Sequence, residues 1–285
     1  MTPRRICDRA FLAACLAGQF FSMTLLLGIL AIVVAKGIGV IDWTFLTSPP
    51  AGGGRSGGIG PAILGTLLLV VTTGILAAPL ALGLALVRTE YFQPGRVRSF
   101  FELVLYTING VPSILFGLFG YEVIVNRMGL GKSWLAGGLV LAVMILPTIA
   151  VSIHEQIEAL PPSYRDQARA LGLNRAKVIW SVVLPQTLPG ILTGTLLGLG
   201  RASGETAPIM MTAAVFTGVH VPTGIRDNPV LALPYHLFVL AQDSHDPASI
   251  SNAWGTALVL LGMAFLLTLA SLPFRVGWRR EEEAR

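Results

Sequence analysis

Charged side chains are scarce in this chain. Only 12% of its 285 residues are Asp, Glu, Lys or Arg, and 53% are hydrophobic, whereas soluble domains are roughly a quarter charged. This composition predicts an all-α protein that crosses a membrane several times. The basic residues behind a pI near 9.6 alternate with apolar runs and form no long patch. We therefore predict contact with membrane lipid and no nucleic-acid partner.

Cysteine and histidine are also rare. Cys7 and Cys15 are the only cysteines, and both lie in or beside the first apolar run, so they indicate neither a disulfide framework nor a cysteine-based zinc site. His220, His236 and His245 fall in a predicted outer loop, at spacings typical of no metal site. We predict that no metal is bound and that these histidines are ordinary loop residues.

A nucleotide-binding motif is missing as well. Gly131, Lys132 and Ser133 resemble the end of a phosphate-binding loop, but that loop needs glycine where Asn126 stands, and a strand before it. No other nucleotide motif occurs in the sequence. We therefore predict that the chain is not an enzyme, hydrolyses no ATP itself and binds no cofactor.

Six apolar runs are long enough to cross a bilayer as helices rising about 1.5 Å per residue. They predict one membrane domain, 1–285, with spans near 11–35, 62–87, 100–120, 134–153, 185–210 and 252–274. A cleaved signal peptide is the alternative for the first run, but its apolar core would cover only about 7–15 residues. We therefore favour a retained first span.

Arginine and lysine are distributed unevenly between the predicted loops. Fourteen of the 20 fall on the side that would hold both ends of the chain, five fall on the other side, and Arg201 lies within a span. Basic residues favour the cytoplasmic side of a membrane. The sequence therefore predicts a multi-pass membrane protein with both termini in the cytoplasm.

The third apolar run is interrupted at its centre by the segment 109–113, which reads Asn-Gly-Val-Pro-Ser. Pro112 removes a backbone donor and Gly110 loosens the turn. A broken helix in a membrane is tolerated where protein or a cavity satisfies its backbone. One interpretation makes Asn109 and Ser113 part of a transport path, and the alternative is a simple kink.

The fifth predicted span carries two charges, Arg201 and Glu205, one helical turn apart. A charge near the membrane centre costs about 2.5–3.5 kcal/mol on insertion scales and usually has a function. A guanidinium suits phosphate-like anions because it donates two parallel hydrogen bonds. We predict that Arg201 and Glu205 line an anion path, with Ser203 and Thr206 as further donors. A structural ion pair is the alternative.

The same span repeats glycine every four residues, at Gly190, Gly194 and Gly198. Such spacing places small residues on one helical face and permits close contact with a neighbouring helix. This pattern is common in helical bundles, so by itself it indicates packing and no particular function.

The predicted cytoplasmic loop 154–181 has the pattern of a helix, a turn and a second helix. Ser163, with Asp166 three residues later, predicts a capping box after two prolines. Gly172 is expected to end this helix in the left-handed conformation, and Asn174 to cap the next helix. The loop is either a docking helix for a partner or an ordinary amphipathic loop.

This loop resembles the cytoplasmic motif of permease subunits of ABC importers, E-A-A, three residues, G, nine residues, I-x-L-P. The matching positions, conservative at the first and fifth and divergent at the second, are Asp166, Gln167, Ala168, Gly172, Val182, Leu184 and Pro185. The resemblance implies the type I ABC importer permease fold with six transmembrane helices. It also implies that the loop inserts a coupling helix into a separate ATPase subunit.

A second resemblance, over nearly the whole chain, is to phosphate-import permeases of the PstA family. Its most specific element is R-x-x-G-E-T-A-P at 201–208, and further matching segments lie at 49–50, 111–114 and 116–120. The resemblance implies an inorganic phosphate importer in the bacterial cytoplasmic (inner) membrane. The implied partners are a second, PstC-like permease, two PstB-like ATPase subunits that bind ATP and Mg, and an extracytoplasmic PstS-like phosphate-binding protein.

Two other functions remain open from the sequence. One is a permease for another oxyanion, such as sulfate or molybdate. The other is an ion-coupled secondary transporter, which would need carboxylates within its spans and no docking helix. Glu205, and Glu102 at the edge of a span, are the carboxylates that would serve it.

Overall fold

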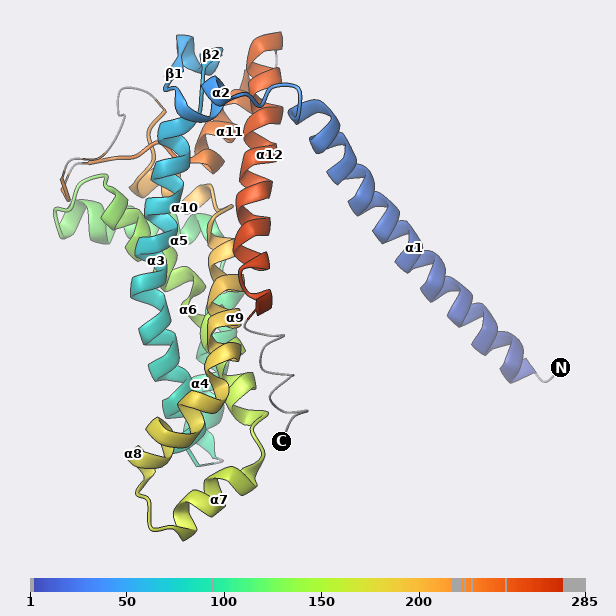
Figure 1. Cartoon of the computed structure of the whole chain (residues 1–285), viewed down its shortest axis with the longest axis vertical. Coiled ribbons are helices and arrows are strands. Elements are labelled where there is room, and N and C mark those ends of the chain that lie inside the picture. Colours follow the sequence, from blue (N-terminus) through green and yellow to red (C-terminus); the bar gives the residue numbers. More distant parts are fainter. Residues whose placement is uncertain are drawn as a thin grey trace.

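The computed structural model describes residues 3–93, 95–216, 222, 224–226, 228–243 and 245–273. Most of them form a bundle of long helices with short helices at both ends (Figure 1). In chain order the elements are α1 (Pro3–Gly37), α2 (Trp43–Thr47), β1 (Pro50–Ala51), η1 (Gly52–Gly54), β2 (Ser56–Gly57), α3 (Gly60–Leu86), η2 (Val87–Tyr91), α4 (Arg96–Asn109), α5 (Ser113–Gly120), η3 (Tyr121–Arg127), α6 (Trp134–Glu158), α7 (Pro162–Ala170), α8 (Arg175–Val178), η4 (Ile179–Val183), α9 (Leu184–Ala202), α10 (Ala207–Thr212), α11 (Leu233–Gln242) and α12 (Pro247–Leu269).

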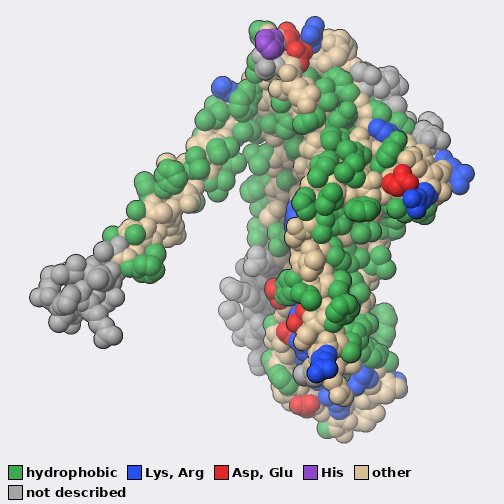
Figure 2. Space-filling view, turned by 180° about the vertical axis from the view of Figure 1, so that it is seen from behind, with side chains coloured by type: hydrophobic (Ala, Val, Ile, Leu, Met, Phe, Trp, Pro, Cys, Tyr) green, Lys and Arg blue, Asp and Glu red, His purple; other side chains and the backbone are tan. Residues whose placement is uncertain are grey.

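Among the described residues, five helical segments are long and apolar enough to cross a membrane. They are Phe11–Gly37, Gly60–Tyr91, Trp134–Glu158, Arg175–Ala202 and Pro247–Leu269. A sixth span results if the bent pair Arg96–Asn109 and Ser113–Arg127 is counted as one. Hydrophobic side chains cover the middle of the bundle, and Lys and Arg lie mainly toward its ends (Figure 2). These features confirm the predicted all-α polytopic membrane fold.

Helix α6 forms the centre of the bundle and packs between α3 and α9. Two thirds of its apolar window is buried, compared with one third for the windows of α3 and α9. Ile145, Ile149, Ile153 and Ile157 recur every four residues and are at most 1% exposed, so they form one helical face directed into the core.

The glycine face of α9 packs directly on α6, as its spacing predicted. A Cβ atom added at Gly190, Gly194 or Gly198 would lie 2.5 Å from an α6 side chain, respectively that of Gln156, Ser152 and Ile149. Any larger residue would therefore push the two helices apart. This contact fixes the position of α9, and with it the position of Arg201.

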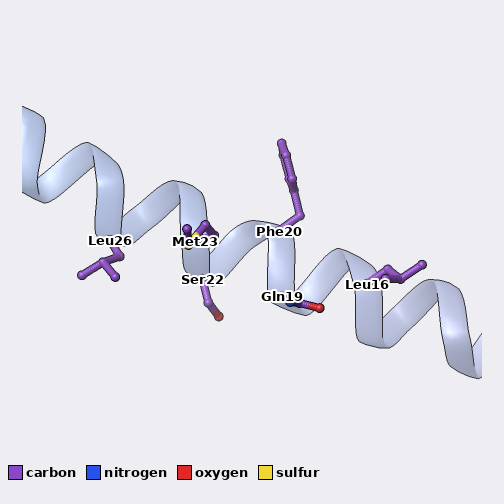
Figure 3. Close-up of a pocket in the computed structure, with 6 residues that line it drawn as sticks. All are labelled: Leu16, Gln19, Phe20, Ser22, Met23 and Leu26. Atoms are coloured by element: carbon purple, nitrogen blue, oxygen red, sulfur yellow. The ribbon is translucent and has the colours of Figure 1, made fainter. Parts of the chain in front are cut away.

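Helix α1 stands away from the bundle (Figure 1), and none of its apolar window is buried. It contacts α12 through its last turns: Gly37 lies against Trp254 and Leu258, and the Lys36 ammonium lies 4.9 Å from the centre of the Trp254 ring. The six side chains in Figure 3 all project from this one helix, so the hollow between them is open helix surface.

Several predicted boundaries differ from the structure. The segment predicted as one span at 185–210 begins as a helix at Arg175 and ends at Ala202, and residues 207–212 form the separate helix α10. Residues 203–206 separate the two helices, and Pro208 lies in the first turn of α10, where its missing backbone donor needs no helical partner. Pro185 similarly follows the wide π-helical turn η4, whose widening accommodates the missing hydrogen bond.

Two further segments that lie between the predicted spans are helical. Residues 121–127 continue α5 as the π-helical segment η3. The apolar piece 229–241 contains α11, which packs on α12 and buries Leu233, His236 and Leu240. His236 is therefore a core residue, whereas His220 lies outside the described residues.

Candidate functional site

Arg201 lies in the last turn of α9, with 54% of its side chain exposed. Its Nε atom lies 3.7 Å from Oε1 of Glu205, whose side chain is 18% exposed. The sequence had predicted that Glu205 would lie on the same helix as Arg201, but α9 ends at Ala202 and Glu205 lies beyond it. It is reached by a turn in which its backbone N–H donates to the Ala202 carbonyl at 3.2 Å. The ion pair is therefore longer than a hydrogen bond and leaves guanidinium donors available.

Thr148 of α6 joins Arg201 to Asn109 of α4. Nη1 of Arg201 donates to the Thr148 hydroxyl at 3.4 Å, and that hydroxyl donates to Oδ1 of Asn109 at 2.9 Å. Three helices thus bring together two residues that the sequence had proposed for the same path. We call Asn109, Thr148, Arg201 and Glu205 the Arg201 cluster. Thr148 was missed from the sequence because it follows Pro147 in an apolar run, with no charge to mark it.

The break before α5 leaves the half-buried Asn109 at the end of α4. The axes of Arg96–Asn109 and Ser113–Arg127 differ by 92°, which shows a broken helix and not a simple kink. The N–H groups of Gly110 and Val111 donate to carbonyls three residues back at 3.0 and 3.2 Å, and Pro112 has no N–H to satisfy. Asn109 is thereby the last residue of α4, and three residues separate it from the start of α5.

The remaining predicted donors are less directly placed. Ser203 is 2% exposed, and its hydroxyl donates to the Gly200 carbonyl at 2.7 Å. Ser113 begins α5 and Thr206 precedes α10; both are half-buried. Within the part of the chain that the structure describes, none of these three side chains bonds to Arg201.

The loop 154–181, predicted to dock on an ATPase and called the coupling loop below, forms the end of the molecule that carries α7 (Figure 1). Gly172 adopts φ = +79°, and the N–H groups of Gly172 and Leu173 donate back to the carbonyls of Arg169 and Ala168. This is the predicted glycine cap in its Schellman form. The side chain of Asn174 accepts from the Lys177 N–H at 2.9 Å, which confirms the second predicted cap.

Two details of the coupling loop differ from expectation. Ser163 does not cap α7, because Pro161 occupies the cap position and the helix begins at Pro162. The apolar side chains also do not share one buried face, as an amphipathic loop would suggest: Ala168 is 5% exposed and packs inward, whereas Leu171 is 82% exposed. The short helix places its small residue against the bundle and turns its large one outward.

The motif residues divide in the same way between the surface and the bundle. The exposed ones are Asp166, Gln167, Gly172 and Pro185, and the half-buried ones are Val182 and Leu184. Trp180, between these groups, is 73% exposed. This end of the molecule therefore presents charged and large apolar side chains together.

Ion pairs and a buried histidine organise the opposite end of the molecule. Arg55 lies 3.2 Å from Asp243 and 3.5 Å from Asp246, which caps α12. Hydrogen bonds from the Ser249 side chain and backbone lower the pKa of Asp246. Burial lowers the pKa of His236 to about 4, and its ring stacks on Phe216 at 5.2 Å between centroids. His236 is therefore neutral near pH 7.

The fold is that of type I ABC importer permeases. A permease chain of the MetNI methionine ABC transporter superposes with a TM-score of 0.60 over 76% of this chain and 95% of that one, at 15% identity. A chain of a bacterial alginate ABC transporter superposes with a TM-score of 0.61 over 94% of both chains, at 14% identity. These likenesses define the class of protein by fold alone.

Sequence comparison gives the family. Residues 71–276 match the binding-protein-dependent transport system inner membrane component family, and the chain belongs to it. It is 33% identical to the phosphate transport system permease protein PstA 2 of Mycobacterium bovis, over 96% of this chain and 89% of that protein. It is 36% identical to a probable PstA of Methanocaldococcus jannaschii, over 91% and 90%. The chain is thus a membrane permease subunit of a binding-protein-dependent transporter.

Proposed function

We propose that this chain forms half of the membrane path of an ATP-driven importer of inorganic phosphate, and that the Arg201 cluster contacts the anion during passage. The observation that carries this proposal is the placement of Arg201. Its guanidinium is half exposed, touches Glu205 and Thr148 only at 3.7 and 3.4 Å, and sits where α4, α6 and α9 meet. The similar proteins named as phosphate transport permeases support phosphate as the anion.

The geometry suits transient binding. An arginine fork can donate two parallel hydrogen bonds to phosphate oxygens, and passage requires binding strong enough to enter and weak enough to leave. Glu205 lies close enough to attract Arg201 when the path is empty. The carboxylate then competes with the departing anion and accelerates its release. Asn109 and Thr148 add polar atoms on the side of α4 and α6.

The proposal includes the partners of the importer. A second, PstC-like permease completes the path, two PstB-like ATPase subunits hold ATP and Mg, and a PstS-like protein delivers phosphate. Support for an ATPase partner comes from the coupling loop, which presents Leu171 and Trp180 to solvent beside its charged residues. The excess of basic residues in the loops on that side supports cytoplasmic termini in a bacterial inner membrane.

The proposal is tested on the complex purified with its partners from phosphate-starved cells and reconstituted in liposomes. We expect co-purification of an ATPase and a second permease, with ATP-dependent uptake of radiolabelled phosphate once the binding protein is added. Excess unlabelled phosphate should compete, and sulfate or molybdate should not. Uptake inhibited by sulfate or molybdate would replace phosphate by another oxyanion. Ion-driven uptake by the chain alone would establish a secondary transporter.

A further inference from the structure

The π-helical turn η2, at the end of α3, contacts four different elements through four consecutive side chains. Each of Arg88, Thr89, Glu90 and Tyr91 has its own partner. In order, the partners are Glu102 of α4, His154 of α6, Arg165 of α7 and Arg175 of α8. We call these eight residues the η2 junction. Its contacts connect the coupling loop to the transmembrane helices.

The first two contacts hold the transmembrane helices. Nε and Nη2 of Arg88 donate to one oxygen of Glu102 at 3.2 and 2.9 Å, and the Arg88 side chain is 7% exposed. The Thr89 hydroxyl lies 2.8 Å from Nδ1 of His154 and also donates to the carbonyl of Ala85. The end of α3 is thereby fixed to α4 on one side and to α6 on the other.

The other two contacts hold the coupling loop. Nε of Arg165 lies 2.9 Å from Glu90, and the two side chains are 13% and 3% exposed. The same guanidinium donates to the carbonyls of Leu160 and Ile157 at 3.1 and 2.8 Å, so it also binds the end of α6. On the far side of the loop, the Arg175 guanidinium lies 5.2 Å from the Tyr91 ring centroid, within cation–π range.

Two of the elements that η2 contacts, α4 and α6, also carry residues of the Arg201 cluster, and a third, α8, leads into the helix that carries Arg201. Asn109 lies seven residues beyond Glu102 on α4, and Thr148 lies six residues before His154 on α6, or about 9–11 Å along each helix. Helix α8 continues through η4 into α9, which ends beside Arg201. Only short helical distances therefore separate the η2 junction from Asn109 and Thr148.

We infer that the η2 junction transmits movement of the coupling helix to the Arg201 cluster, with Glu90 and Arg165 as the positioning pair. This inference rests on the proposed function, because it takes the partner ATPase to be what moves α7. Breaking a buried ion pair by removing one charge leaves the other uncompensated, so the pair forces α7 and the end of α3 to move together. An exposed pair would permit slippage.

The test measures anion uptake and ATP hydrolysis on the same reconstituted complex. Glu90→Gln and Arg165→Gln should each lower the number of anions transported per ATP by about tenfold, within the usual range of coupling between sites. ATP turnover and recovery of the complex should stay within about twofold of the unmodified protein. Arg127→Gln is the matched control, because Arg127 and Glu122 also form a 2.9 Å Nε–Oε1 pair, but one that is 73% and 52% exposed.

The double variant Glu90→Gln with Arg165→Gln should be no worse than either single variant, because the pair acts as a unit. An unchanged ratio of uptake to hydrolysis, or additive losses in the double variant, would overturn the inference. Failure of the single variants to assemble would also overturn it, since the pair would then be a folding contact. The ratio is measured with whichever oxyanion the unmodified complex transports. If that oxyanion is not phosphate, the proposed substrate is wrong, but the inference about Glu90 and Arg165 is still tested.

Discussion

The two Arg–Glu pairs described above, both within the membrane-spanning domain, have opposite physical characters. Arg165 and Glu90 are 2.9 Å apart and 13% and 3% exposed, whereas Arg201 and Glu205 are 3.7 Å apart and 54% and 18% exposed. In the first pair the Arg165 guanidinium donates to Glu90 and also to two backbone carbonyls. In the second, much of the guanidinium remains available to a third group.

The difference indicates that the two pairs have different functions. We call Arg165–Glu90 the fixed pair and Arg201–Glu205 the available pair. Buried pairs gain little net stability, but they define one geometry, because any other leaves a charge unpaired. Exposed pairs contribute about 0–1 kcal/mol and exchange partners easily. The fixed pair therefore suits the transmission of movement, and the available pair suits an anion that must bind and leave.

Replacing the available charge should have the largest effect. We expect Arg201→Gln to reduce phosphate uptake by about 100-fold or more, because the anion then meets no charge-assisted donor in the path. Arg201→Lys keeps the charge without the fork and should retain intermediate uptake. Both variants should assemble normally, since Arg201 makes only long contacts. Unimpaired uptake by Arg201→Gln in membrane vesicles would make Arg201–Glu205 a structural pair.

Disturbing the packing between α9 and α6 should have the next largest effect. Gly194→Leu places a side chain where even a Cβ lies 2.5 Å from Ser152 Oγ, and overpacking of this kind costs about 1–3 kcal/mol. We expect a lower thermal unfolding temperature of the purified complex, together with weaker uptake. Gly262→Leu on α12 is the control, because a Cβ there has no atom within 4 Å. Equal effects at both positions would show that α9–α6 contact has no special role.

His236 extends the comparison to a buried polar group for which the described residues offer no charged partner. Burial lowers its pKa to about 4, from about 6.5 in an unfolded chain. The unfolded state binds the proton more readily between these values, so stability is complete above about pH 6.5 and falls as the pH drops toward 4. Between about pH 8 and pH 5, the free energy of unfolding around α11 should fall by about 2 kcal/mol.

Hydrogen exchange of the α11 backbone amides at the two pH values measures this loss. His236→Phe is the informative comparison, because it preserves an aromatic ring against Phe216 and cannot be protonated. The variant should remain equally protected at both values. Equal pH dependence in the variant and the unmodified chain would assign the effect to other groups.

The smallest expected effect comes from the link between Asn109 and Arg201. Thr148→Val keeps the shape of the side chain and removes the hydroxyl that Arg201 contacts at only 3.4 Å. We expect the KM for uptake to rise about threefold, as is typical of a weak hydrogen bond. Thr193→Val is the control, because that hydroxyl donates to the Pro189 carbonyl of its own helix. If both variants behave alike, Thr148 does not position Arg201.

Local patterns predicted much of this architecture. Apolar runs located five spans, the positive-φ glycine at 172 and the cap at Asn174 were recognised, and the glycine repeat of α9 indicated close packing. The proximity of Arg201 to Glu205 also followed from their spacing. Each of these depends on residues within one or two helical turns, where sequence alone constrains geometry.

Contacts between distant segments were not predictable in this way. The bond from Thr148 to Asn109 joins residues 39 apart, and the bond from Arg201 to Thr148 joins residues 53 apart. Neither has a local signature. The inward direction of Ala168 and the burial of His236 likewise depend on which neighbour packs against each helix. The end of α9 at Ala202 was missed because the span was predicted to run on to residue 210, across residues 203–206, which separate α9 from α10.

The π-helical geometry of η2 limits the insertions and deletions that this segment of the chain can tolerate. A π-helical turn is an α-helix that has accommodated one extra residue, and each residue turns the helix by about 100°. Deleting one residue from Val87–Tyr91 would restore regular α-helix and rotate the following side chains to other faces. Arg88, Thr89, Glu90 and Tyr91 would then no longer face four different partners. We therefore expect substitutions in this segment to be tolerated more often than insertions or deletions, even those remote from Arg201.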